Sequence, residues 1–205
     1  YPSQSASGGD AFFGTSNNYR TPQAGDYAWL IVLHEIGHTL GLKHGHETDV
    51  YGTLPADVNF MEYSLMTYRS YIGHQGNNYT NAHGSYPQTY MMLDIAALQH
   101  MYGADYETNS GDTVYSWEPN SGDTLVDGAI AIDASAVNIF ATIWDGGGFD
   151  TYDLSVYRTD LDIDLNHFLT ITITTIVITI TTATIVATIH NREQCMFAIL
   201  MDNVG

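Results

Sequence analysis

The chain has 205 residues, and its 23 acidic side chains against 5 basic ones give a formal net charge of -18. This acidic excess argues against nucleic acid or an anionic membrane surface as a partner, and it favours bound cations that relieve the repulsion among carboxylates. A solvated acidic surface without metal explains the same composition, so charge alone does not select between the two. The single cysteine, Cys195, excludes an internal disulfide.

The first predicted element is a helix that enters the run His-Glu-Ile-Gly-His-Thr-Leu-Gly-Leu-Lys-His, which starts at His34. His34 and His38 are four residues apart, so on a helix both imidazoles project from one face and can bind one zinc ion. Glu35 lies beside that face, where a carboxylate can act as general base. Gly41 permits the left-handed backbone that ends the helix and returns His44 to the same metal. The pattern predicts a catalytic zinc site, whereas a chance histidine-rich helix end is the weaker alternative.

The next predicted helix lies in the segment 92–104 and is expected to begin at Asp94. Its apolar residues Ile95, Leu98 and Met101 recur at a spacing that predicts packing of one face against a core. Gly103 is the stop signal.

Two glycine-rich segments flanked by acidic or amide residues follow, at 109–115 and 144–155. Such turns expose main-chain carbonyls beside carboxylates, which is the oxygen-rich environment that calcium prefers. Ordinary hairpin turns of glycine and aspartate are the alternative. From about residue 167 to 190 the chain alternates threonine and isoleucine, which predicts β-structure. That stretch is too polar for a membrane span and too long for one strand, so turns must interrupt it.

These features together resemble the serralysins, the secreted bacterial zinc metalloproteases of the metzincin clan that carry a calcium-binding β-roll. The zinc motif, the segment Tyr-Ser-Leu-Met-Thr-Tyr at 63–68 and the helix at 92–104 carry the resemblance, which covers roughly residues 6–166. It implies that Met66 forms an apolar floor beneath the metal. It also implies that Tyr68 is a zinc ligand at rest and an oxyanion donor during catalysis, although a merely packed aromatic ring is the alternative for Tyr68.

The resemblance further implies calcium ligands in the two glycine-rich segments and in the strand region after them. The residues concerned are Asn109, Gly111, Thr113, Asp145, Gly147, Gly148, Asp150 and Thr188. His190 stands where the family has a glutamate, and imidazole nitrogen is a poor ligand for calcium, so the second calcium site should be weak.

Two departures from the serralysin pattern concern the ends of the match. Serralysins have a longer segment before the zinc helix, so we expect the chain to be a fragment. They also have tandem G-G-x-G-x-D repeats after the second glycine-rich segment, and no such array is present in this sequence. Most of the β-roll is therefore expected to be absent.

The sequence predicts an α+β architecture: a partial metzincin catalytic domain at 1–104, followed by an all-β, calcium-binding region at 105–205 that resembles a parallel β-roll. The resemblance implies a secreted, extracellular zinc endopeptidase with Zn²⁺ and Ca²⁺ as cofactors. Its partners would be protein or peptide substrates and a protein protease inhibitor, and we expect a monomer. The alternatives are a non-catalytic, calcium-binding structural or adhesive protein, and another metzincin branch such as the astacin-like enzymes.

Overall fold

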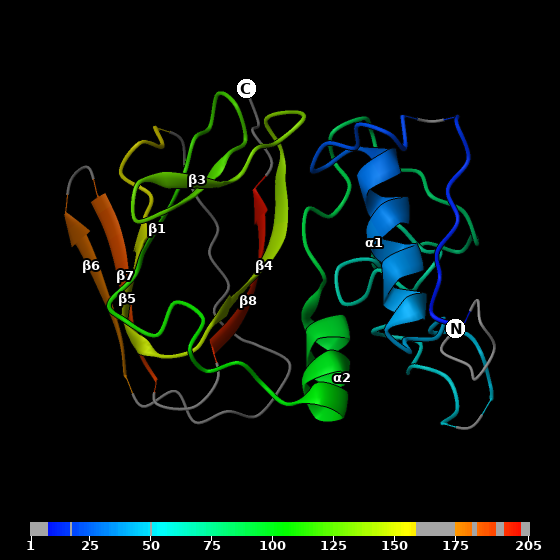
Figure 1. Ribbon diagram of the computed structural model, residues 1–205. Coiled ribbons are helices and arrows are strands. Elements are labelled where there is room, and N and C mark those ends of the chain that lie inside the picture. Colours follow the sequence, from blue (N-terminus) through cyan, green and yellow to red (C-terminus); the bar gives the residue numbers. More distant parts are fainter. Residues whose placement is uncertain are drawn as a thin grey trace. The chain divides into compact units, whose positions relative to one another are not determined.

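The computed structural model describes residues 8–16, 18–49, 51–158, 175–181, 184–191 and 195–201, the last three ranges by their backbone alone. The chain divides into two compact units, Tyr1–Ala104 and Asp105–Gly205. Within the described residues the first unit contains both helices, and the second contains every strand (Figure 1). No described helix is long and apolar enough to cross a membrane. The architecture is α+β, as predicted.

Helix α1 (Tyr27–Thr39) is the central element of the first unit. It begins after Asp26, whose side chain accepts a hydrogen bond from the main-chain nitrogen of Trp29 at 2.8 Å. It ends at Thr39 with Leu40 as its C-cap, and Gly41 then adopts a φ of +100°, a backbone conformation that favours glycine. The buried core of this unit includes Leu30, Val58, Met61, Leu65, Met66 and Met91.

Helix α2 (Met92–Tyr102) confirms the predicted second helix, and Gly103 caps it with a φ of +89°. The predicted packing face holds only in part, because Ile95 and Leu98 are partly buried whereas Met101 is 45% exposed. The buried residue of the helix is Asp94, which lies in its first turn rather than at its start. A buried polar residue in the first turn therefore anchors this helix.

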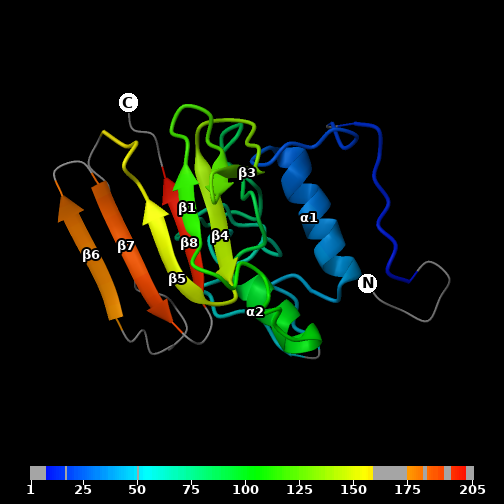
Figure 2. The same cartoon turned by 60° about the vertical axis from the view of Figure 1, so that its left-hand side comes forward.

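The second unit contains two sheets, whose strands are labelled in Figures 1 and 2. The six-stranded sheet has the order β3-β2-β1-β5-β7-β6, and the smaller sheet pairs β4 with β8. The strands are β1 (Val114–Trp117), β2 (Thr124–Val126), β3 (Ala129–Ile132), β4 (Ile139–Asp145), β5 (Gly148–Asp153), β6 (Thr175–Thr181), β7 (Thr184–Asn191) and β8 (Cys195–Met201). Strand β4 is buried along nearly its whole length.

The direction of the strands differs from the predicted parallel β-roll. Among the named strands, β1 and β5 form the parallel pair, and every other recorded pairing is antiparallel. Short connections such as those between β1, β2 and β3 permit only antiparallel neighbours. The threonine- and isoleucine-rich stretch forms β6 and β7, with Thr181 opposite Thr184, so the prediction of interrupted β-structure is confirmed there. Residues 167–174 of that stretch lie outside the described part.

Candidate metal centre

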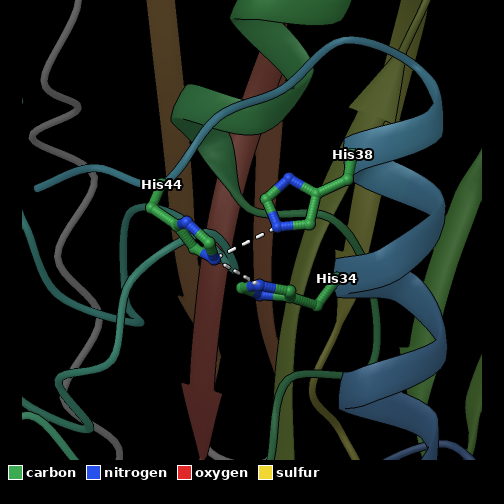
Figure 3. A group of neighbouring side chains, drawn as sticks. All are labelled: His34, His38 and His44. Atoms are coloured by element: carbon green, nitrogen blue, oxygen red, sulfur yellow. Dashed lines mark hydrogen bonds between the residues drawn. The ribbon is translucent and has the colours of Figure 1, made fainter. Parts of the chain in front are cut away.

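Three histidine side chains converge at the C-terminal end of α1 (Figure 3). His34 and His38 come from successive turns of the helix, and His44 comes from the loop after Gly41. Their candidate ligand atoms all lie within 4.8 Å of one another. The Nε2 atom of His44 is 3.1 Å from Nε2 of His34 and 3.1 Å from Nε2 of His38. Among the residues with described side chains, no other group of three histidine, cysteine or carboxylate ligands converges in this way.

The other ring nitrogen of each histidine has a fixed acceptor. Nδ1 of His34 lies 2.8 Å from the carbonyl of Leu65, and Nδ1 of His38 lies 2.9 Å from the carbonyl of Leu42. Nδ1 of His44 is 2.8 Å from a carboxylate oxygen of Glu47. A carbonyl or carboxylate oxygen only accepts, so in each neutral ring the proton resides on Nδ1 and Nε2 bears a lone pair.

This donor set fits a zinc ion. In each short contact between Nε2 atoms, a lone pair faces a lone pair and neither nitrogen has a proton to donate, so the two atoms repel one another. A cation at the point of convergence removes this repulsion. Two zinc–nitrogen bonds of about 2.1 Å at a tetrahedral angle place their nitrogens about 3.4 Å apart, close to the separations in the structure. Three imidazoles leave a fourth position open, which is the arrangement of a catalytic rather than a structural zinc site.

Burial keeps the helical histidines neutral. Burial lowers the pKa of His34 to about 4. The hydrogen bond to Leu65 opposes this change, and the neighbouring His38 and His44 add to it. The pKa of His38 is also lowered, again mainly by burial. Neutral imidazole is the form that binds zinc, so these rings are available as ligands across the physiological pH range.

Glu35 and Tyr68 adjoin the histidine cluster. Glu35 is half-buried, and its charge partly opposes the lowering of the His38 pKa and adds to the raising of the Tyr68 pKa, so its carboxylate lies near both side chains. The Tyr68 hydroxyl lies 2.7 Å from Nε2 of His44, and its ring stacks at 5.9 Å on that of His34. Burial is the main cause of the raised pKa of Tyr68, so the hydroxyl remains protonated and can donate a hydrogen bond.

The segment around Met66 lies against α1. A Cβ atom built on Gly37 would come within 2.9 Å of the Met66 sulfur, so the sulfur touches the helix one residue before His38. Met66 is 2% exposed. The main-chain nitrogen of Leu65 donates to Asp94, and the carbonyl of Leu65 accepts from His34. The Met66 segment therefore orients a candidate ligand in addition to packing against α1.

The predicted calcium residues also come together, in the second unit. Asp145 and Asp150 are 3% and 6% exposed, and burial raises the pKa of both carboxyl groups, to about 6 for Asp150. Asp145 accepts hydrogen bonds from the Tyr115 hydroxyl at 2.6 Å and from the main-chain nitrogen of Gly147 at 2.7 Å. Asp150 accepts from the main-chain nitrogen of Thr113 at 3.1 Å. Two buried carboxylates thus lie where the glycine-rich segments meet.

Main-chain oxygens of the first glycine-rich segment lie beside these carboxylates. The Thr113 hydroxyl donates to the carbonyls of Asn109 and Gly111, each at 3.1 Å. A Cβ atom on Gly148 would collide with the Gly111 carbonyl, so the two segments touch at that point. Thr188 is opposite Thr151 on the neighbouring strand, and His190 is opposite Phe149. The backbone brings Thr188 to the same sheet region, and its side chain lies outside the described part.

Several residues of these sites were not found from the sequence. Glu47 follows His44 at a spacing of three, which is the signal in the sequence that a carboxylate can reach the ring. The carbonyls of Leu42 and Leu65 have no sequence signal, because any residue supplies a carbonyl. Asp112 and Asp127 add their charges to the group around Asp150, and their positions were recognisable only as acidic residues near turns.

Comparisons with known proteins point to one family. Residues 104–191 match the family model described as Peptidase M10 serralysin C terminal. The chain is 36% identical over 168 residues to Metalloprotease AprA of Pseudomonas entomophila (strain L48), a match that covers 77% of this chain and 34% of that protein. It is 38% identical over 153 residues to Serralysin of Proteus mirabilis, covering 71% of this chain and 29% of that protein. With Serralysin C of Dickeya chrysanthemi it shares 36% identity over 170 residues, covering 81% and 34%.

These matches support the serralysin family, a class of metalloproteases by the names of its members. The family model covers the strand-rich unit and not the histidine motif. The pairwise matches extend further, because 77% of the chain is more than the second unit contains. The chain spans about a third of the length of the curated relatives it matches.

Proposed function

We propose that the chain is part of a secreted zinc endopeptidase of the serralysin type, with the catalytic machinery in 1–104 and a calcium-binding region in 105–205. The observation that carries the proposal is the convergence of the Nε2 atoms of the three histidines. Each Nδ1 donates its proton to a carbonyl or carboxylate oxygen, which leaves a lone pair on Nε2 for a metal ion. Protein or peptide chains are the substrates, a protein inhibitor is a further partner, and the protein acts as an extracellular monomer.

The residues of the site divide the chemistry of peptide hydrolysis among them. Zinc, when held by the three histidines, would supply Lewis acidity and lower the pKa of the attacking water. Glu35 takes the proton of that water and later returns it to the departing amine. The Tyr68 hydroxyl donates a hydrogen bond to the oxyanion that develops as the attacked carbon becomes tetrahedral. Because Tyr68 is partly buried near Glu35, its proton is retained for this role.

The test is cleavage of casein or a quenched peptide by the chain and by Glu35→Gln, with zinc content measured in parallel and calcium present. The matched control is Glu107→Gln, which removes the same charge at an exposed position in the second unit. We expect Glu35→Gln to bind one zinc ion and to lose cleavage, while Glu107→Gln keeps both. Near-native cleavage by zinc-loaded Glu35→Gln would show that Glu35 is not the general base.

We also propose that calcium binds between the two glycine-rich segments and stabilises the second unit. Buried Asp145 and Asp150 repel one another, and Asp112 and Asp127 raise the pKa of Asp150 further, so a divalent cation relieves a real electrostatic cost. The ligands proposed are those predicted from the sequence, with main-chain oxygens completing the shell. Calcium should raise the melting temperature of the chain, and Asp150→Asn should remove most of that increase.

The second candidate function is a non-catalytic, calcium-binding structural or adhesive protein. The extent of the family match, which is confined to residues 104–191, favours it. The presence of Glu35 together with all three histidines argues against this candidate. A protein without catalytic activity is under no selection to keep the complete set. A chain that binds zinc and calcium but cleaves no peptide under any tested condition would support this candidate.

A further inference from the structure

The three candidate zinc ligands differ in how their second ring nitrogen is held. His34 and His38 project from α1 and donate to main-chain carbonyls. His44 lies beyond the end of the helix, and its ring donates to the carboxylate of Glu47. The helix therefore fixes two of the three ligands, and a side-chain carboxylate from a loop orients the third.

Glu47 holds His44 at two points. One carboxylate oxygen lies 2.8 Å from Nδ1 of the ring, and the other accepts from the main-chain nitrogen of His44 at 3.2 Å. The main-chain nitrogen of Glu47 donates in turn to the carbonyl of His44 at 3.1 Å. Ring and backbone of the ligand are thus tied to the same residue, which restricts rotation of the imidazole away from the metal position.

The loop that presents Glu47 is itself held in place. The Lys43 ammonium donates to the carbonyls of Glu47 and Gly52, each at 2.6 Å. Leu54 donates through its main-chain nitrogen to the carbonyl of Gly45 at 2.8 Å, which closes the loop. Glu47 is thereby positioned from its backbone as well as through its contact with His44.

We propose that Glu47 is a positioning residue that sets the zinc affinity of the site through His44. This inference rests on the proposed zinc site. A carboxylate partner fixes the tautomer of a metal-binding imidazole and raises its basicity, and loss of such a partner costs 10- to 100-fold in metal affinity. Lys43 acts one step further out, by holding the loop in which Glu47 lies.

The experiment measures zinc dissociation constants by competition with a chromophoric chelator at fixed pH, independently of proteolysis. Glu47→Ala removes both the charge and the acceptor, whereas Glu47→Gln keeps an acceptor of the same shape. Asp49→Asn is the matched control, because it removes one negative charge from an exposed position of the same loop. We expect zinc binding to weaken 10- to 100-fold in Glu47→Ala, less in Glu47→Gln, and less than threefold in Asp49→Asn.

Two results overturn the inference. One is zinc affinity within threefold of the parent in Glu47→Ala, and the other is an equal loss in Asp49→Asn, which would assign the effect to loop charge. The absorption spectrum of the cobalt-substituted protein provides a second readout, because a change in the His44 ligand field shifts its d–d bands. Far-ultraviolet circular dichroism of the metal-free variants verifies that each retains its fold.

The failure of this inference is distinguishable from failure of the proposed function. If the parent chain binds zinc but cleaves nothing, the affinities still decide the role of Glu47. If the parent chain cleaves peptides and Glu47→Ala binds zinc as tightly as the parent does, the protease function stands and the role of Glu47 is refuted.

Discussion

Replacing Gly148 with alanine should disrupt the second unit more than the same change at its neighbour Gly147. Both glycines have strongly positive φ values, +135° and +142°, so an alanine at either position is strained by about 1 to 3 kcal/mol. The positions differ in their surroundings. A Cβ atom on Gly148 would collide with the Gly111 carbonyl oxygen, while one on Gly147 has nothing within 4 Å.

The collision at Gly148 cannot be relieved by a side-chain rotation, because the atoms it meets belong to the main chain. The Gly111 carbonyl must move by about 1 Å, and such overpacking adds about 1 to 3 kcal/mol. We therefore expect Gly148→Ala to lose about 2 to 6 kcal/mol, and Gly147→Ala about 1 to 3 kcal/mol. Because Gly111 is also a proposed calcium ligand, Gly148→Ala should weaken calcium binding as well.

The assay is denaturant unfolding in saturating calcium, together with a calorimetric calcium titration, on both variants and on Gly111→Ala. A Cβ atom on Gly111 would meet nothing within 4 Å, and alanine keeps the main-chain carbonyl of that residue, so Gly111→Ala controls for the loss of a glycine alone. Equal destabilisation by Gly147→Ala and Gly148→Ala, with unchanged calcium affinity, would refute the contact between the two segments.

Four further predictions concern both units. Gly37→Ala should weaken zinc binding severalfold, because its Cβ atom would displace the Met66 sulfur 2.9 Å away; chelator competition measures this. Asp94→Ala should lower the free energy of unfolding by about 3 to 5 kcal/mol, since it leaves three buried donors without their acceptor; denaturant unfolding of the metal-free chain measures this. Burial raises the folded-state pKa of Asp150 to about 6, so the stability of the calcium-free chain should fall as pH rises through about 6 and the buried carboxyl ionises. Calcium affinity should change in the opposite sense and fall as pH drops below about 6, because binding needs the carboxylate. Unfolding and calcium titration from pH 5 to 8 test both signs. Tyr68→Phe should lower kcat 100-fold or more with little change in KM; steady-state kinetics decide whether the hydroxyl acts in the transition state.

The histidine cluster was predictable because its information is local. Helical spacing places His34 and His38 on one face, and a single glycine returns His44 to them. The acceptors behind the rings were less accessible. Leu65 is distant in sequence from His34, and it contributes only a main-chain carbonyl, which no side-chain pattern reveals.

Helix α2 was predicted correctly as an element, but the way in which it packs was predicted only in part. Its extent and its glycine stop were readable from the sequence, and its apolar residues suggested a buried stripe. The anchor is instead Asp94, which accepts hydrogen bonds from Ser64 at 2.6 Å and from Leu65 at 2.7 Å. Hydrogen bonds between residues distant in sequence cannot be read from the spacing of apolar residues. Although these bonds favour the carboxylate, burial raises the pKa of Asp94 to about 6.

Strand direction was the least predictable feature of the second unit. Alternating threonine and isoleucine indicate β-structure and an apolar face, but they do not specify which strand pairs at either edge or in which direction. The pairing of β5 with β7 joins segments far apart in sequence. The parallel arrangement was expected from family resemblance, and only the β1–β5 pair among the named strands has it.

The most direct test of the central claim is X-ray absorption at the zinc edge of the zinc-loaded chain. Three imidazole nitrogens from His34, His38 and His44 predict nitrogen scatterers at about 2.0 to 2.1 Å with the outer-shell pattern of histidine rings. A shell made of oxygen alone, or one that contains sulfur from Cys195, would contradict the zinc centre on which the proposed peptidase function depends.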